Sequence, residues 1–443
     1  MSYNNFNKQL LTRYVESECK RQLFLDLAYA MPEKWYTDDR KIEKPEKIRK
    51  MPKLLVKLGK KYEQKVYSRL KLIKGAHFNL DHKDRVDETY LNPSLFTQLY
   101  EELKESPITD FILLEHQFEV PDSFLDYIFP PKEGIMEVPV NYGEQRPDIM
   151  VIGTSNSKKE DEVFELLNDG IIRKVPESEL NSRYGINIID IKNTREDHVG
   201  KKQFIEIFYY LWTLSYYLKQ YKLDDKFFVH IDYNGIFPQY NEEELLNLRS
   251  FEDLFELTIE IRWDESIQVF IDTIEKIKKL WFKAPLPIES TSVNIQPSCG
   301  YCYFIEDCKK SLGMDGVKEP KDWSLKLIPC TSMSIAQQLV KLGFQTISDV
   351  ADRINKTPVG NTPNPLYSEL PLLENKALAL VNDKVVFPRP GHTHTYTLPK
   401  FSPIAITFAV ETDPANERVY AAGFFLQMST FASAPFSGVF DKW

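Results

Sequence analysis

An acidic residue and a lysine stand two positions apart at the end of an apolar run. In GINIIDIKNT, Asp190 and Lys192 close a stretch of isoleucines that is typical of a buried β-strand. Residues i and i+2 of a strand project from the same face of the sheet. The carboxylate could bind Mg²⁺ or Mn²⁺, while the ammonium group orients or activates a water and stabilises charge on a phosphate. The pair therefore suits metal-assisted phosphodiester hydrolysis.

This spacing is not specific by itself. It recurs at Asp39/Lys41, Glu102/Lys104, Asp224/Lys226 and Glu319/Lys321, none of which ends an apolar strand. Two further carboxylates strengthen the pair at 190–192: Asp148 precedes an apolar run in RPDIMVIG, and Glu63 lies in GKKYEQKVYSRL. Taken singly, Asp148 is also compatible with a turn and Glu63 with a solvated helix face.

A polar residue and two tyrosines follow on an aromatic stretch. Gln203 and Tyr210 are seven residues apart in QFIEIFYYLWTL, hence on one face of a helix, and Tyr209 is the other candidate partner. The alternative interpretation is a helix buried for its aromatic side chains alone.

Three cysteines lie within ten residues in QPSCGYCYFIEDC, namely Cys299, Cys302 and Cys308. Such spacing wraps a loop around one metal centre and requires a fourth ligand, for which Cys19 is the natural candidate. All-thiolate sites hold zinc as well as iron–sulfur clusters. Cys330 lies outside the pattern, and we interpret it as a small core residue.

The elements that must position these residues follow from periodicity. We expect strands at 110–120, 148–152, 186–191 and 227–232, and helices at 53–73, 203–220 and 266–281. The first thirty residues read as one amphipathic helix carrying Cys19, and residues 335–354 as helix, Gly343, helix. A polar insertion, about 155–183, has no assigned role. This order indicates an α/β or α+β core.

Bulk properties narrow the class of protein. The chain has 443 residues, 42% of them hydrophobic, enough for two or three domains. It shows no signal peptide and no apolar stretch near 20 residues, so we expect a cytoplasmic protein without a membrane span. The net charge is −9, but residues 40–74 hold fourteen Lys or Arg against three Glu, a local +11. That segment could bind a phosphate backbone or be a solvated helix.

The order of these motifs resembles the RecB-like branch of the PD-(D/E)XK nucleases, over roughly residues 10–310. The resemblance implies a restriction-endonuclease-like core, a mixed sheet flanked by helices. It implies metal ligation by Glu63, Asp148 and Asp190, helped by the Ile191 backbone carbonyl. Lys192 would be the catalytic lysine. Gln203, with Tyr209 or Tyr210, would position DNA.

The cysteine split, one before the core and three after it, resembles the iron–sulfur RecB-like nucleases, which include AddB-type helicase–nucleases and CRISPR-associated nucleases. This implies a [4Fe–4S] cluster on Cys19, Cys299, Cys302 and Cys308, with zinc as the alternative. It also implies a setting in DNA repair, recombination or antiviral defence, and a helicase or another subunit as a partner.

The last forty residues read as a strand pair. FAVETDPANERVYAAGF resembles the first hairpin of an RNase H-like exonuclease domain, but Ala409 stands where that family has its first acidic residue, although Glu411 is present. We expect no second active site there.

We thus expect five segments: 1–52 with the first cysteine and a basic linker; 53–290, the nuclease core; 291–320, the cysteine segment; 321–390, a helical connector or helix-hairpin-helix-like module; and 391–443, the β segment. The expected function is an Mg²⁺- or Mn²⁺-dependent deoxyribonuclease acting on single-stranded DNA or DNA ends. The alternative is a non-catalytic nucleic-acid-binding or scaffold subunit.

Overall fold

A computed structural model describes residues 8–30, 53–73, 91–105, 110–131, 145–153, 162–261, 263–287, 290–295, 299–300, 302–329, 331–353 and 365–386, and the backbone of 404–413 and 418–428. The chain divides into two compact units, one formed by Met1–Glu46 with Val56–Ser292 and the other by Lys47–Leu55 with Val293–Trp443.

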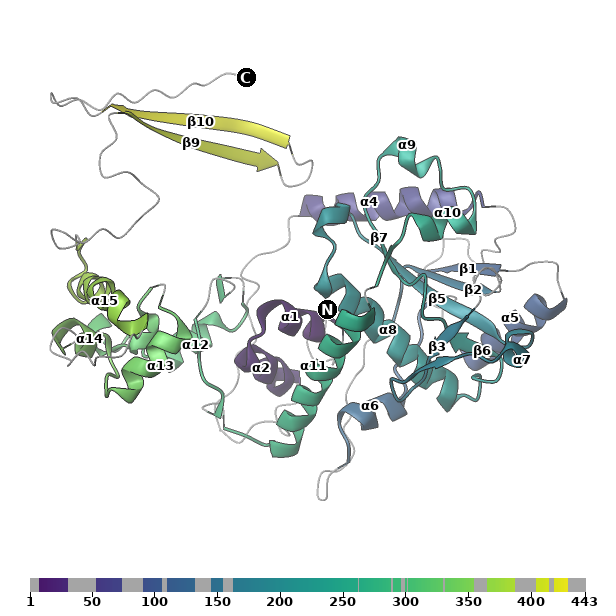
Figure 1. Ribbon diagram of the computed structural model, residues 1–443, viewed down its shortest axis with the longest axis horizontal. Coiled ribbons are helices and arrows are strands. Elements are labelled where there is room, and N and C mark those ends of the chain that lie inside the picture. The colour runs from purple at the N-terminus through teal and green to yellow at the C-terminus, as the bar shows by residue number, and fades with distance from the viewer. Residues whose placement is uncertain are drawn as a thin grey trace. The chain divides into compact units, whose positions relative to one another are not determined.

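The first unit is built on a six-stranded mixed sheet (Figure 1). Its strands are β1 (Asp110–Leu114), β2 (Ile149–Gly153), β5 (Tyr184–Ile191), β6 (Phe227–Val229), β7 (Gly235–Phe237) and β8 (Ile259–Glu260). The order is β1-β2-β5-β7-β8, with β6 also paired to β5. β5 runs antiparallel to β2 and parallel to β6 and β7. The expected mixed sheet flanked by helices is confirmed, as is the α/β class.

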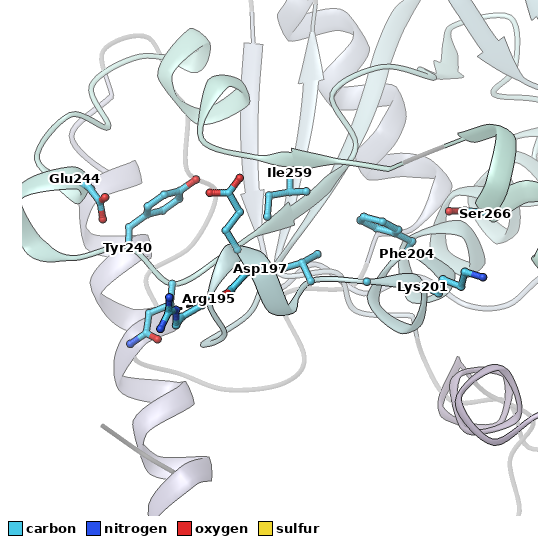
Figure 2. Close-up of a pocket in the computed structure, with 12 residues that line it drawn as sticks. Arg195, Asp197, Lys201, Phe204, Tyr240, Glu244, Ile259 and Ser266 are labelled. Atoms are coloured by element: carbon cyan, nitrogen blue, oxygen red, sulfur yellow. Dashed lines mark ion pairs between the residues drawn. The ribbon is translucent and has the colours of Figure 1, made fainter. Parts of the chain in front are cut away.

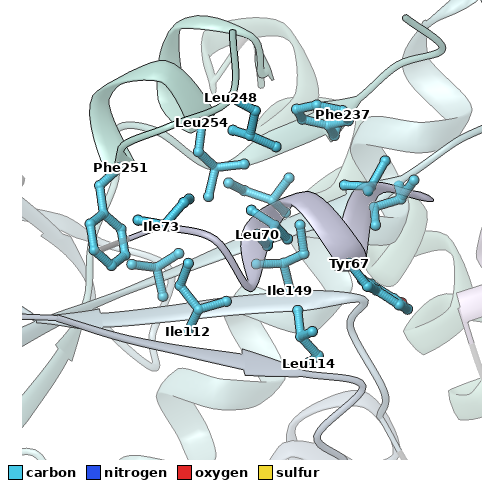
Figure 3. Packing of buried hydrophobic residues seen from close by; sticks show 14 of the residues in the cluster. Tyr67, Leu70, Ile73, Ile112, Leu114, Ile149, Phe237, Leu248, Phe251 and Leu254 are labelled. Atoms are coloured by element: carbon cyan, nitrogen blue, oxygen red, sulfur yellow. The ribbon is translucent and has the colours of Figure 1, made fainter. Parts of the chain in front are cut away.

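Helix α4 (Lys53–Leu70) covers one face of this sheet. Its buried residues recur three or four positions apart, as the apolar periodicity predicts: Tyr62, Val66, Tyr67 and Leu70. They pack on apolar side chains of β1, β2, β5 and β7, and on the segment after β7 (Figure 3). Ile189 and Ile191 belong to this cluster, so the even-numbered residues of β5 face the opposite side.

Helix α8 (Lys201–Gln220) packs against β5, β6 and β7, and its side chains are buried without a break from Ile207 to Leu218. Further helices pack around it, namely α1 (Lys8–Ser17), α6 (Asp122–Ile128) and α11 (Trp263–Lys283). The other α-helices in the described residues of this unit are α2 (Lys20–Ala30), α5 (Pro93–Glu105), α7 (Glu177–Leu180), α9 (Glu242–Leu245) and α10 (Phe251–Glu256).

Several expected elements differ from the structure, and the strand expected at 227–232 is shorter, because β6 ends at Val229. The prediction of a single N-terminal helix is wrong. The helix is interrupted between α1 and α2 at Glu18, whose φ of 50° lies in the left-handed region. The strand expected at 110–120 ends at Leu114, because Glu115 has a φ of 53°. The described part of the polar insertion folds into a hairpin of β3 (Phe164–Leu166) and β4 (Ile172–Lys174), followed by α7.

The second unit is mainly helical. It contains α12 (Ile305–Ser311), α13 (Met333–Lys341), α14 (Ile347–Arg353) and α15 (Pro365–Asn382). The expected helix, Gly343, helix arrangement is confirmed, and Gly343 has a φ of 90°. Helices α13, α14 and α15 share a hydrophobic core that includes Leu339, Ile347 and Leu373. Whether this segment is a connector or a helix-hairpin-helix module stays a prediction.

The expected strand pair near the end of the chain is confirmed. β9 (Ile404–Asp413) and β10 (Arg418–Met428) form an antiparallel two-stranded sheet, with an irregularity between Val419 and Ala421. Ala409 is opposite Gly423, and Glu411 is opposite Ala421.

None of the helices in the described residues has the length and apolar character that crossing a membrane requires.

Candidate active site

Asp148 and Asp190 are brought together by the pairing of β2 with β5. The antiparallel register pairs Ile149 with Ile189, so the next position along the ladder sets Asp148 opposite Asp190. The backbone N–H of Ile191 donates to Asp148 Oδ2 at 2.6 Å, which fixes that carboxyl group at the end of β2. Asp190 is buried and Asp148 half-buried.

The two carboxyl groups are hydrogen-bonded to each other, and their pKa values move in opposite directions. Burial, and then the charge of Asp190, raise the pKa of Asp148. Burial also opposes ionisation of Asp190, but the charges of Lys192 and Lys8 lower its pKa below its usual range. The pair can therefore hold one proton between them, as closely spaced carboxylates do.

Lys192 lies on the same face as Asp190, as the strand periodicity predicts. Its ammonium group forms ion pairs with Asp190 Oδ2 and, at 2.8 Å, with Glu206 Oε2. Burial lowers the pKa of Lys192, but the charges of Asp190 and Glu206 outweigh that effect and raise it. The lysine is a fixed positive charge held between two carboxylates.

Helix α8 contributes two side chains to this centre. Glu206 reaches Lys192, and Tyr210, one turn later on the same helix face, donates from its hydroxyl to the Arg146 backbone carbonyl at 3.0 Å. Burial, and then the charges of Asp190 and Asp148, raise the pKa of Tyr210. The other candidate tyrosine, Tyr209, packs against Phe124 in the core, with ring centroids 5.8 Å apart.

The side chain of Gln203 forms a hydrogen bond at the start of α8. Its Oε1 accepts from the Gly200 backbone N–H at 3.1 Å, which satisfies a donor at the helix N-terminus. The DNA-positioning role implied for Gln203 stays a prediction. Sequence reasoning missed Glu206, although a lone acidic residue in an aromatic helix, four positions before Tyr210, was an available signal.

Two glutamates approach the aspartate pair from other elements. Glu63 is half-buried on α4, and burial, followed by the charges of Glu115 and Asp190, raises its pKa. Glu115, which sequence reasoning also missed, follows β1 in its left-handed conformation. Its N–H donates to the Asp148 carbonyl at 3.0 Å, and its carboxylate lies 3.7 Å from Arg146 Nη2.

The charge of this centre suits a divalent cation. The acidic side chains are Glu63, Glu115, Asp148, Asp190 and Glu206, and the basic ones are Lys8, Arg146 and Lys192. Fully ionised, these groups sum to −2. In the part of the chain that the structure describes, no three His, Cys, Asp or Glu side chains already form a metal-binding group. Carboxylate oxygens are the donor type that Mg²⁺ and Mn²⁺ prefer.

The four cysteines of the expected cluster occur in both units. In the first unit, Cys19 immediately precedes α2, and its Sγ accepts from the Gln22 backbone N–H at 3.4 Å. In the second unit, the Cys302 N–H donates to the Cys299 carbonyl at 3.0 Å, and Cys308 lies on α12. Cys299 and Cys308 are buried and Cys302 is half-buried. Cys330 lies outside the described residues.

A cavity of about 720 Å³ opens beside the segment that links Lys192 to α8 (Figure 2). Arg195 and Lys201 line it together with Glu196, Asp197 and Glu244. This lining is slightly acidic, so the cavity does not resemble a groove for a phosphate backbone.

Comparison of the chain with protein-family models, with curated proteins and with solved structures found no significant match.

Proposed function

We propose that this protein is a metal-dependent DNA nuclease of the RecB-like PD-(D/E)XK type. The observation that carries the proposal is the register of β2 and β5, which sets Asp148 opposite Asp190 and puts Lys192 beside them. Two carboxylates and a lysine with this spacing are suited to phosphodiester hydrolysis. A scaffold protein has no need for a partly buried group of ionised side chains, which is costly to maintain.

Each residue has a defined task in the proposed reaction. Glu63, Asp148 and Asp190 would hold Mg²⁺ or Mn²⁺, which when bound polarises a phosphate and lowers the pKa of a water. Lys192 donates hydrogen bonds to the phosphate, and its positive charge stabilises the charge on the phosphate. Asp190 and Glu206 keep the ammonium group of Lys192 oriented. The Ile191 N–H holds Asp148 in place.

The proposed substrate is DNA that is single-stranded or has free ends. Helix α4 carries exposed lysines on the turns around Glu63, namely Lys57, Lys60, Lys61 and Lys65. These can contact phosphates on either side of the acidic centre. Residues 40–52 and Lys74 of the basic segment lie outside the described residues. A helicase, or another repair or defence subunit, is the partner class implied by the same resemblance.

We also propose that Cys19, Cys299, Cys302 and Cys308 ligate a [4Fe–4S] cluster, with zinc as the alternative. Thiolates are the ligands of both centres. The N–H contact to Cys19 Sγ and the closely spaced Cys299 and Cys302 suit such a role.

The test of the nuclease is cleavage of end-labelled single- and double-stranded DNA with and without Mn²⁺. We expect metal-dependent cleavage by the wild type and none by Asp190→Ala, with both proteins folded by circular dichroism. Equal cleavage by the two proteins would overturn the assignment. Metal-independent DNA binding without cleavage by either would favour the scaffold alternative.

A further inference from the structure

Lys8 lies in the acidic centre although it is far from Asp190 in the chain. Its ammonium group donates to the Tyr210 hydroxyl and lies 3.8 Å from Glu206 Oε2. The side chain is 24% exposed, close to the 30% of Lys192. Lys8 and the proposed catalytic lysine, Lys192, therefore lie in the same centre and are exposed to solvent to a similar extent.

Helix α1 is held there by its own packing. Leu10, Leu11 and Tyr14 are buried, and α1 packs against α8 and α11. An exposed ion pair of 3.0 Å joins Glu16 to Lys202 on α8. Because α1 is anchored along its length, the position of Lys8 at its first residue is fixed by the helix.

Glu206 Oε2 is shared by two lysines. It lies 2.8 Å from Lys192 Nζ and 3.8 Å from Lys8 Nζ. The two ammonium groups repel each other, but the five carboxylates of the centre offset their charge and leave the sum at −2 when all groups are ionised. A divalent cation on those carboxylates would bring the sum to zero, and both ammonium groups would then attract an anion such as a phosphate. An ammonium group has three donors. Among the described residues, Lys8 donates one hydrogen bond, to Tyr210, and its contact with Glu206 at 3.8 Å is an ion pair.

We propose that Lys8 is a second phosphate-binding residue of the active site, supplied by the N-terminal helix. It contacts an oxygen of a DNA phosphate next to the one that Lys192 contacts, and Glu206 and Tyr210 orient it. This inference rests on the proposed nuclease function. It also means that the sheet and α8 do not form the complete active site by themselves, because Lys8 reaches the centre only when α1 is docked on α8.

The test compares Lys8→Met and Lys8→Arg with Lys276→Met. Lys276 also contacts α1, with its Nζ 5.4 Å from the Tyr14 ring centroid. Binding of a fluorescein-labelled single-stranded oligonucleotide is measured in Ca²⁺ across a salt series, and cleavage in Mn²⁺. For Lys8→Met we expect kcat/KM to be roughly 10- to 100-fold lower. The salt slope, which is the change in log binding constant with log salt concentration, should be smaller by about 0.7. Lys8→Arg should keep most of both, and Lys276→Met should match the wild type.

Lys8→Gln covers the case in which Lys8→Met fails to fold, because it keeps a donor for Tyr210 and Glu206 but lacks the charge. A folded Lys8→Gln protein with the wild-type salt slope and kcat/KM would overturn the inference. If Asp190→Ala were inactive at the same time, the nuclease assignment would stand and only the role of Lys8 would fall. If the wild type neither bound nor cleaved DNA, both proposals would fall.

Discussion

At the scale of single residues, the closeness of Asp148 and Asp190 comes from backbone register. A slip of one position between β2 and β5 would turn one of the two side chains to the other face of the sheet. The hydrogen bond from the Ile191 N–H to the Asp148 side chain is compatible only with this register and helps to fix it. The site is therefore as rigid as the strand pair that carries it.

Glu206 and Gln203 lie one turn apart on α8 and should respond differently to substitution. Glu206→Gln removes the charge that orients Lys192, so we expect kcat to fall by about tenfold, with a smaller change in KM. Gln203→Ala removes a contact at the helix N-terminus, which should cost up to about 1 kcal/mol of stability. Steady-state cleavage and thermal melting of both variants test this. A larger kcat loss for Gln203→Ala than for Glu206→Gln would support the DNA-positioning role implied for Gln203.

Part of this site was predictable from local spacing. Asp190 and Lys192 share a face because a strand alternates, and that rule needs no tertiary information. Lys8 and Glu115 could not be predicted, because their approach depends on how α1 and β1 pack. Glu206 had a local signal, its place one turn before Tyr210 on one helix face, but its contact with Lys192 depends on the packing of α8 against β5.

At the scale of secondary structure, α4 has two faces with separate tasks. Its buried residues pack on the sheet, while Lys57, Lys60, Lys61 and Lys65 are exposed. Helices α4, α8 and α11 and strand β5 were predictable, since each has a long apolar pattern. The break between α1 and α2 was not, because Glu18 is a non-glycine residue in a left-handed conformation, which sequence rules do not favour.

The buried face of α4 should dominate its contribution to stability. Leu70 is fully buried, whereas Leu72, just beyond the helix, is 66% exposed. We expect Leu70→Ala to lower the free energy of unfolding by about 2–5 kcal/mol. Leu72→Ala should change it by less than about 0.5 kcal/mol. Urea denaturation measures both, and similar losses for the two variants would contradict the packing of α4.

The exposed face of α4 should dominate DNA binding. We expect the triple charge reversal of Lys57, Lys60 and Lys61 to Glu to weaken single-stranded DNA binding and to reduce the salt slope by about 2, the value for three lost contacts. Fluorescence anisotropy across a salt series measures this. The matched control reverses exposed lysines on other elements, namely Lys104, Lys174 and Lys219. Equal losses in the two triple variants would show that net charge, not α4, governs binding.

At the scale of the whole molecule, the chain comprises two compact units with separate cores. The cysteine spacing predicted a metal centre that draws on distant parts of the sequence, and the thiols occur in both units. Thiolate type and spacing do not distinguish iron from zinc, because both metals accept four sulfur ligands. Only a measurement of the bound metal decides between them.

The proposed cluster predicts a coloured protein whose stability depends on its cysteines. Anaerobically purified protein should be brown, absorb broadly near about 400 nm and contain about four iron atoms per chain. Cys302→Ser should remove the colour and lower the melting temperature, since metal ligation contributes directly to folding. Cys330 lies outside the pattern, so Cys330→Ser should keep the colour and the wild-type melting temperature. A colourless wild type with stoichiometric zinc would establish the alternative metal. Iron retained in Cys302→Ser would instead remove Cys302 from the ligand set.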